Sequence, residues 1–197
     1  MEREEMGEGE RRGRDAVRRT ALGWGNAGLL LLVLAVALAG YAVPCHGLDT
    51  DKTRASLEGL PGVYLMVEDL RLEIEEDGLT RNEIHGFAKK LLTSAGIRLL
   101  SEEEWQETPG RPWLYLYAHV MRREYVEERV YLFNISIEVK QQVRLSRAPD
   151  AEPIYATTWS RSILGKSGWL EDIRKGVELS LQDFIEAYRS VNGSPEG

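Results

Sequence analysis

The sequence is poor in cysteine and histidine, and it has fewer basic than acidic side chains. Its 197 residues include one Cys, 25 Lys and Arg, and 32 Asp and Glu. A single Cys cannot form an internal disulfide, which excludes a disulfide framework. No two of His46, His85 and His119 stand at metal-ligand spacing, so no metal site is predicted. The net charge of −7 argues against nucleic acid as a partner, because a phosphate backbone is held mainly by Lys and Arg.

Residues 1–47 differ from the rest of the chain. They carry six basic and six acidic side chains, so the whole net charge lies in the remaining residues. Five arginines between positions 11 and 19 precede the uncharged run Ala27–Ala39. This pattern is typical of a secretory signal, and the small residues Ala37 and Ala39 predict cleavage after Ala39. The segment therefore predicts export to the periplasm or cell envelope.

Four alternatives remain for this segment. Residues 21–43 are long enough for an uncleaved transmembrane anchor. They could also form a buried core helix. Arg18 and Arg19 have the spacing of a twin-arginine signal, although a generic basic region explains the same residues. Cys45 follows the apolar run as in a lipoprotein, but Pro44 stands where Gly, Ala or Ser is expected.

The remaining chain predicts a polar linker at 48–62, one domain at 63–192 and a disordered tail at 193–197. Thr80 and Glu83 form a capping box before a helix with an apolar stripe, and Gly96 ends that helix. The acid-rich segment 68–77 is predicted to be a solvated loop. A second capping box at Ser101–Glu104 predicts one helical turn ending near Trp105.

Five strands and a second helix complete the prediction. The order is β-α-β-β-β-β-α, an α+β two-layer sandwich with a mixed, mostly antiparallel sheet and both helices on one face. The predicted strands are Val63–Val67, Ile97–Leu100, Trp113–Met121, Val130–Leu145 and Ile154–Ser162, and the last helix is Gly168–Val191. The strand at 97–100 is expected to lie parallel to the first strand.

This order of elements from Val63 to Tyr188 resembles a set of bacterial envelope domains. The segments that carry the resemblance are Ala95-Gly96-Ile97, the Glu-rich stretch Ser101–Glu107, and the strands in 114–120, 133–145 and 156–162. The domains are typified by the TolB amino-terminal domain, CsgG and LpoB, and the chain is also similar to uncharacterised bacterial exported proteins. The resemblance implies a non-enzymatic module that binds or regulates envelope components. It assigns no functional residue.

The residues offer little catalytic chemistry, and no cofactor is predicted. Gly165-Lys166-Ser167 matches the end of a phosphate-binding loop, but Ser160 stands where that motif needs its first Gly. A turn in which Ser167 caps the last helix explains the same residues. The acids in 68–77 could bind a cation, although a run of charges is usually solvated. An envelope hydrolase or metal-dependent enzyme with an unrecognised site is the alternative function.

The sheet face away from the helices is the predicted binding surface. If the aliphatic faces of the strands pack on the helices, large rings and polar groups share the other face. The predicted binding residues are Trp113, Tyr115, Tyr117, Tyr155, Trp159 and Arg161. Aromatic rings among polar groups suit an envelope protein, peptide or glycan as partner. The same rings could instead only support a half-solvated sheet through cross-strand pairing.

Overall fold

The computed structural model describes residues 42–45, 47–126 and 128–193. The predicted export segment lies outside the described residues, apart from its last part at Ala42–Cys45 and Gly47. The predicted tail beyond Gly193 also lies outside them. In the described part of the chain, no helix has the length and apolar character needed to cross a membrane.

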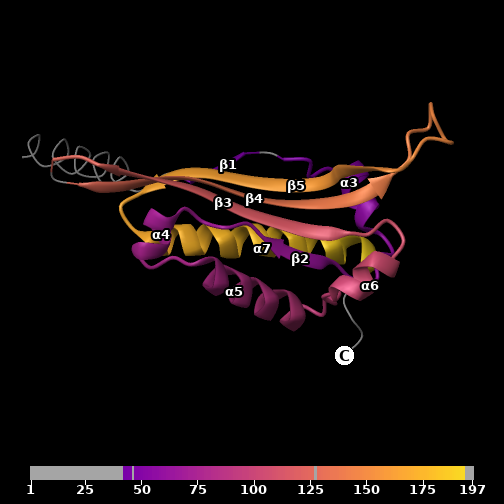
Figure 1. Cartoon of the computed structure of the whole chain (residues 1–197), viewed down its shortest axis with the longest axis horizontal. Helices are drawn as coiled ribbons and strands as arrows, with labels where there is room; N and C mark the ends of the chain where they lie inside the picture. Colours follow the sequence, from indigo (N-terminus) through magenta and orange to yellow (C-terminus); the bar gives the residue numbers. More distant parts are fainter. Residues whose placement is uncertain (1–41, 46, 127, 194–197) are drawn as a thin grey trace, which may run out of the picture. The chain divides into compact units, whose positions relative to one another are not determined.

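The fold is α+β, as predicted, and is built on one mixed sheet with the strand order β1-β5-β4-β3-β2. All neighbouring pairs are antiparallel except β2 with β3, which are parallel. The strands are β1 (Ala42–Cys45), β2 (Tyr64–Val67), β3 (Trp113–Glu124), β4 (Arg129–Val143) and β5 (Ile154–Ser167). Figure 1 shows β3, β4 and β5 as the long strands of the sheet layer.

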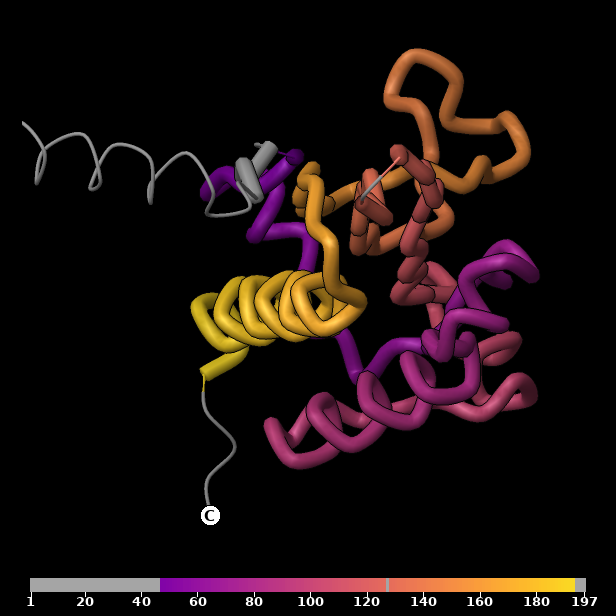
Figure 2. The backbone as a smooth tube through the Cα atoms, turned by 90° about the vertical axis from the view of Figure 1, so that its left-hand side faces the viewer, coloured from indigo at the N-terminus to yellow at the C-terminus, as the bar shows by residue number. Residues whose placement is uncertain are grey.

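Two long helices, α5 (Arg81–Ser94) and α7 (Leu170–Asn192), lie on the same side of the sheet, as Figures 1 and 2 show from two directions. The short helices are α3 (Asp51–Arg54), α4 (Leu72–Glu76), α6 (Glu102–Glu107) and a 3-10 turn at Ala55–Leu57. The Thr80 hydroxyl accepts the Glu83 N–H at 3.2 Å, so α5 begins at the predicted cap.

One predicted strand is replaced by another. Residues Ile97–Leu100 form a single parallel bridge, between Leu99 and Val63, instead of the predicted strand. The fifth strand is β1, which pairs with β5 although the sequence places it in the export segment. Because α6 already begins at Glu102, only Leu99 in this segment pairs with Val63 before the backbone leaves the sheet.

The segment predicted as a linker packs as part of the domain. Leu57 is fully buried, and its carbonyl accepts a hydrogen bond from Asn192 Nδ2 at 2.9 Å. The Tyr188 hydroxyl donates to the Leu60 carbonyl at 2.8 Å. These contacts attach residues 57–60 to the last turns of α7. The polar composition of the segment did not predict them.

The acid-rich segment 68–77 is not the predicted solvated loop throughout. It contains α4, whose Ile74 is fully buried, and it ends at Asp77, whose side chain is 9% exposed. The Asp77 carboxylate accepts hydrogen bonds from Arg122 (3.0 Å), Arg129 (3.1 Å) and Tyr131 (2.9 Å). Asp77 therefore fastens the end of α4 to the hairpin of β3 and β4.

The core lies between the sheet and the two long helices. Alternate residues of β3 and β4 face this layer, as the period-2 pattern predicts. The buried strand residues are Leu114, Leu116, Ala118, Val120, Phe133, Ile135, Ile137 and Val139, and α7 contributes Ile173, Val177, Leu181 and Phe184. Gly176 lets α7 approach β4 closely, because a Cβ there would stand 2.5 Å from Ile135 Cδ1.

Candidate functional site

A β-bulge in β5 decides which side chains reach the face away from the helices. Val139 of β4 pairs with Trp159, but the next residue, Lys140, pairs with Thr157, so Thr158 is an extra residue in β5. Side chains alternate along a regular strand, and one extra residue reverses that alternation. Tyr155 and Trp159 therefore lie on opposite faces of the sheet, although the sequence pattern places them together.

Two of the six predicted binding residues belong to the helix side. Trp159 is fully buried, its ring centroid lies 5.5 Å from that of Phe184, and its indole N–H donates to Asp49 at 3.0 Å. Arg161 donates through Nε to Asp183 of α7 at 2.8 Å. The prediction that Trp159 and Arg161 line the open face is wrong, because the extra residue turns both toward α7.

Asp49 is held where the described chain crosses the edge of β5. Arg54 donates to both of its carboxylate oxygens, at 2.6 and 2.9 Å. These hydrogen bonds, together with that from Trp159, outweigh burial and hold the pKa of the Asp49 carboxyl below its ordinary value. Trp159 thus serves to fix the segment around Asp49 to the core.

The other four predicted residues do come together, in a continuous group of rings that we call the aromatic row. Trp113 lies at its centre, with ring centroids 5.3 Å from Tyr155, 5.8 Å from Trp105 and 6.5 Å from Tyr115. The members of the aromatic row are Tyr64, Trp105, Trp113, Tyr115, Tyr117 and Tyr155. They come from β2, α6, β3 and β5, so the row crosses most of the sheet.

Trp105 and Tyr64 are the members that the sequence prediction missed. Trp105 stacks on Trp113 with an interplanar angle of 11°, and its centroid lies 5.5 Å from that of Tyr64. The capping box at Ser101 was a signal for the helical turn that carries Trp105, and that box is formed. The orientation of the Trp105 side chain toward Trp113 depends on how this helical turn packs, which a local capping motif does not specify.

Charged and polar groups surround the aromatic row. The Tyr115 hydroxyl donates to Glu68 Oε2 at 2.7 Å, and this hydrogen bond, with burial, raises the pKa of Tyr115 to about 12. Lys140 Nζ stands 4.3 Å from the Tyr115 ring centroid and 3.3 Å from Glu138 Oε2. Thr157 also donates to Glu138, at 3.0 Å. Tyr115 is therefore neutral and rigidly held at physiological pH.

The aromatic row is only partly covered. Tyr155 is 42% exposed, while Trp113, Tyr115 and Tyr117 are half-buried. The indole N–H groups of Trp105 and Trp113 are buried and have no hydrogen-bond partner among the described residues. Rings with partly free faces can hold a ligand by stacking, whereas the two buried indole N–H groups are out of reach of a ligand on the surface.

A small hollow of about 190 Å³ lies at one end of this face. It is lined by Glu68, Asp69 and Arg71 after β2, and by the β3 residues from Tyr117 to Val120. His119 is exposed at its rim. The hollow extends the surface beyond Tyr117 and gives it a charged margin.

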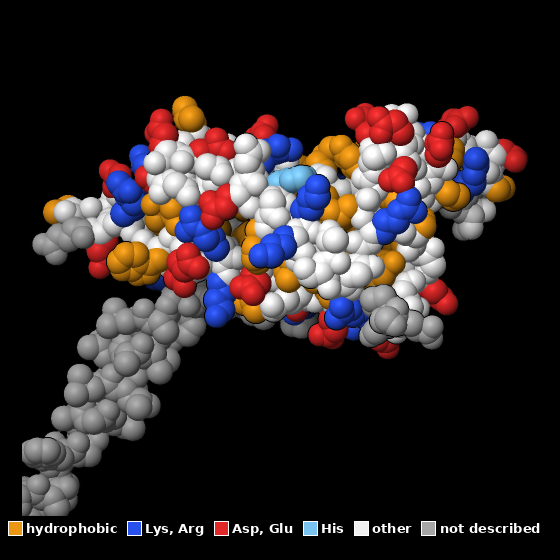
Figure 3. All heavy atoms as spheres, turned by 90° about the horizontal axis from the view of Figure 1, so that it is seen from below, with side chains coloured by type: hydrophobic (Ala, Val, Ile, Leu, Met, Phe, Trp, Pro, Cys, Tyr) orange, Lys and Arg blue, Asp and Glu red, His pale blue; other side chains and the backbone are white. Residues whose placement is uncertain are grey.

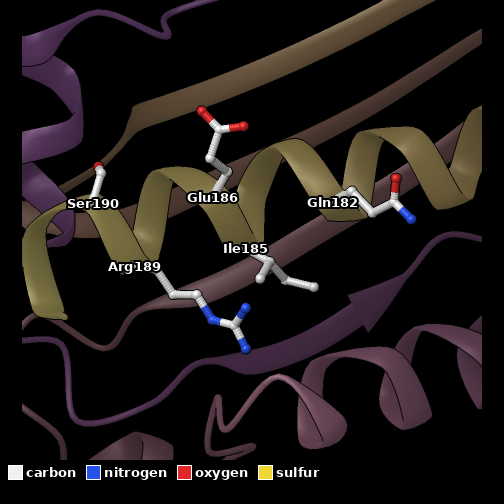
Figure 4. Close-up of a pocket in the computed structure, with 5 residues that line it drawn as sticks. All are labelled: Gln182, Ile185, Glu186, Arg189 and Ser190. Carbon is white, nitrogen blue, oxygen red and sulfur yellow. The ribbon is translucent and has the colours of Figure 1, made fainter. Parts of the chain in front are cut away.

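Two larger hollows lie on the helix layer, and their polar side chains either diverge or are already paired. One, of about 510 Å³, is lined only by residues of α7, and Figure 4 shows Glu186 and Arg189 pointing away from each other. The other, of about 360 Å³, lies between α5 and α7, where Arg174 already pairs with Glu83 at 2.6 Å. Basic and acidic side chains intermingle over the side seen in Figure 3, without a large area of one sign.

The remaining residues with candidate chemical roles are part of the regular structure of the fold. Gly165, Lys166 and Ser167 lie within β5, paired with β4, and do not form the loop that a phosphate site requires. The N-cap of α7 is Trp169 and not Ser167 as predicted, although the Ser167 hydroxyl accepts the Trp169 N–H at 3.0 Å. Over residues 42–45, 47–126 and 128–193, no three His, Cys, Asp or Glu side chains are placed to hold a metal ion.

Comparison with known proteins gives no relative from which a role for these residues could be carried over. No family model, no curated protein and no solved structure matches the chain significantly.

Proposed function

We propose that this chain is an exported protein of the bacterial cell envelope whose domain binds another envelope component without catalysing a reaction. The observation that carries the proposal is the aromatic row on the sheet face that α5 and α7 leave free. The basic segment followed by Ala27–Ala39 supports export. The resemblance to the TolB, CsgG and LpoB type of domain supports the envelope as the site of action.

The chemistry of the aromatic row favours a peptide, protein segment or glycan as ligand. Stacking on Trp113 and Tyr155 would bury apolar area of a sugar ring or of a peptide side chain. Glu138, Lys140 and the Tyr115 hydroxyl fix the polar surroundings of the rings. Fixed rings lose little conformational freedom on binding, which favours affinity.

Site-specific photocrosslinking in cells tests the binding face. A photoreactive amino acid replaces Tyr155 in one variant and Leu179 in a matched control, since these side chains are 42% and 43% exposed. We expect a discrete adduct from position 155 and none from position 179, which lies on α7. Equal labelling at both positions would refute a specific face.

A substitution of Tyr155 distinguishes a binding role of the rings from a purely structural one. Tyr155→Ser should reduce the adduct formed from a photoreactive residue at Tyr117 at least several-fold, while the melting temperature changes by no more than a few degrees. A large fall in melting temperature with an unchanged adduct would mean that the rings only support the sheet. Leu179→Ser is the control for losing a similarly exposed apolar side chain.

A further inference from the structure

Three rings of the aromatic row form a stack that ends at Tyr155. Trp105 lies toward Tyr64 of β2, and Tyr155 comes from β5, so Trp113 stands between the two. The interplanar angles are 11° between Trp113 and Trp105, and 30° between Trp113 and Tyr155. Among the described residues, Tyr155 contacts no further ring, and it is 42% exposed. A planar group of a ligand can therefore extend the stack at this end.

Lys140 shows which kind of group this face accepts. Its Nζ stands 4.3 Å from the Tyr115 ring centroid and 3.3 Å from Glu138 Oε2. An ammonium group between a ring and a carboxylate makes a cation–π contact and an ion pair at the same time. Lys140 pairs with Trp113 in the register of β3 and β4, which places it in the middle of the row. The face thus already holds a side-chain cation of the chain itself.

The charges around the aromatic row are mainly negative. Glu68 accepts the Tyr115 hydroxyl, and Glu138 is paired with Lys140. The helix α6, which carries Trp105, has no basic residue and four acidic ones, namely Glu102, Glu103, Glu104 and Glu107. Hydrogen bonds from backbone N–H groups at the start of α6 hold the pKa of the Glu103 and Glu104 carboxyls below the ordinary value. Both carboxylates are therefore charged at neutral pH.

The basic side chains beside the row are engaged within the protein. Arg98 pairs with Glu104, and Arg111 donates to the Gln106 carbonyl at 3.1 Å. With Lys140 they are three bases against six acids, which leaves an excess of three negative charges. The turn between β4 and β5 does not change this balance, because its residues 144–153 include two basic and two acidic side chains. The surroundings of the row are therefore complementary to a cation.

We infer that the ligand of the aromatic row is a cationic protein segment, one of whose arginine side chains extends the stack at Tyr155. This inference rests on the proposed binding role of the row and names the class of its ligand. A guanidinium group is planar and weakly hydrated, so it stacks on a ring and pairs with carboxylates at once. A neutral glycan would also stack on Tyr155, but it would gain nothing from the acidic surroundings.

Lys140 competes with such a ligand for part of the surface. Removal of its ammonium group frees the Tyr115 ring and the Glu138 carboxylate for a second cation of the ligand. Lys140→Gln should therefore strengthen the binding of a cationic segment. A Lys140 that only supports the sheet would leave this affinity unchanged or lower it when substituted.

Binding of labelled peptides to the full chain, purified in a polyoxyethylene detergent, tests the inference by fluorescence anisotropy. The probe is the peptide Gly-Arg-Gly-Arg-Gly-Arg-Gly, and its matched control carries citrulline, which is planar and uncharged, in place of each arginine. We expect the arginine peptide to bind about tenfold more tightly than the citrulline peptide. Lys140→Gln should raise its affinity roughly threefold, and Tyr155→Ser should lower it roughly fivefold.

Two further variants separate a specific site from general attraction to an acidic protein. Glu68→Gln keeps an acceptor for the Tyr115 hydroxyl and removes one charge beside the row, so the affinity should fall about threefold. Glu186→Gln removes an acid on α7 whose side chain is 74% exposed, and the affinity should stay the same. Equal losses in the two variants would contradict a site at the aromatic row.

The remaining outcomes also overturn the inference. They are failure of the arginine peptide to bind, equal affinity for the citrulline peptide, and no gain of affinity in Lys140→Gln. Displacement of the peptide by a neutral hexamer of N-acetylglucosamine that binds more tightly would assign the face to a glycan instead. In each case, an adduct from position 155 in cells would still support the proposed binding face, so failure of this inference is distinct from failure of the proposed function.

Discussion

Tyr155 and Trp159 are four residues apart on the same strand and experience different environments. The Trp159 ring fills the space between β5 and Phe184 and is fully buried, whereas the Tyr155 ring stacks on Trp113 with much of its surface in water. Removal of a large buried ring loses both the transfer free energy and the packing around the cavity. Removal of a partly exposed ring loses far less.

The two positions should therefore differ strongly in their effect on stability. Trp159→Ala should lower the free energy of unfolding by about 3–5 kcal/mol. Tyr155→Ala should lower it by about 1 kcal/mol or less, as for most exposed positions. Urea denaturation monitored by circular dichroism measures both. Similar losses at both positions would contradict the assignment of these side chains to opposite faces of the sheet.

Asp49 predicts how stability changes with pH. Because its pKa is depressed in the folded protein, its contribution is present above the ordinary Asp value of about 3.9 and is lost as the pH falls through the folded pKa. Asp49→Asn should cost roughly 1–3 kcal/mol at pH 7, where its hydrogen bonds with Arg54 are charge-assisted. Urea titrations at several pH values should show the difference from the native chain shrinking below about pH 4. A difference that stays constant down to pH 2.5 would contradict this account.

At the scale of elements, one glycine allows α7 to pack closely on the sheet. Gly176 faces Ile135 Cδ1, and Ile135 is itself fully buried, so an added methyl group has no free space. Gly86 in α5 is exposed, and a Cβ there meets nothing within 4 Å. Alanine is favoured over glycine in both helices by backbone entropy, so packing alone decides the sign of the net effect.

Substitution of these two glycines should have opposite effects. Gly86→Ala should raise the free energy of unfolding by about 0.5–1 kcal/mol. Gly176→Ala should lower it by about 1–3 kcal/mol, since overpacking exceeds the gain in helix propensity. Thermal and urea unfolding of the two variants provide the comparison, with each serving as control for the other. A stabilising Gly176→Ala would show that Ile135 can move away without cost.

At the scale of the whole molecule, β1 constrains how the chain is processed. Lipoprotein cleavage before Cys45 would remove Ala42–Pro44, three of the four residues of β1. The edge of β5 from Ile163 to Gly165 would then lose its backbone partners. Retention of the anchor, or cleavage after Ala39, keeps β1 complete.

The protein in cells should accordingly retain Ala42. Intact-mass measurement of the membrane and soluble fractions distinguishes the full chain from one that starts at Gly40. A protein that begins at an acylated Cys45 would contradict the role of β1 in the sheet. Labelling with palmitate gives the same distinction independently, since it requires Cys45 to be modified.

Several parts of the fold could be predicted because they depend on local patterns. Thr80 and Gly96 specify the limits of α5 with hydrogen bonds inside a few residues. The alternation along β3 and β4 specifies their buried faces, which needs only a regular period of 2. The strand β1 could not be predicted, since its short apolar segment continues the predicted export signal and its pairing is with residues far along the chain.

The amino-acid sequence by itself determined the α+β composition, the ends of α5, the buried faces of β3 and β4, and the presence of aromatic residues on the other side of β3. Only the tertiary structure decided which rings form the aromatic row. One extra residue, Thr158, reverses the side-chain direction within β5, and the packing of α6 brings Trp105 onto Trp113. Both depend on contacts between segments distant in the chain, and such contacts leave no periodic signal in the sequence.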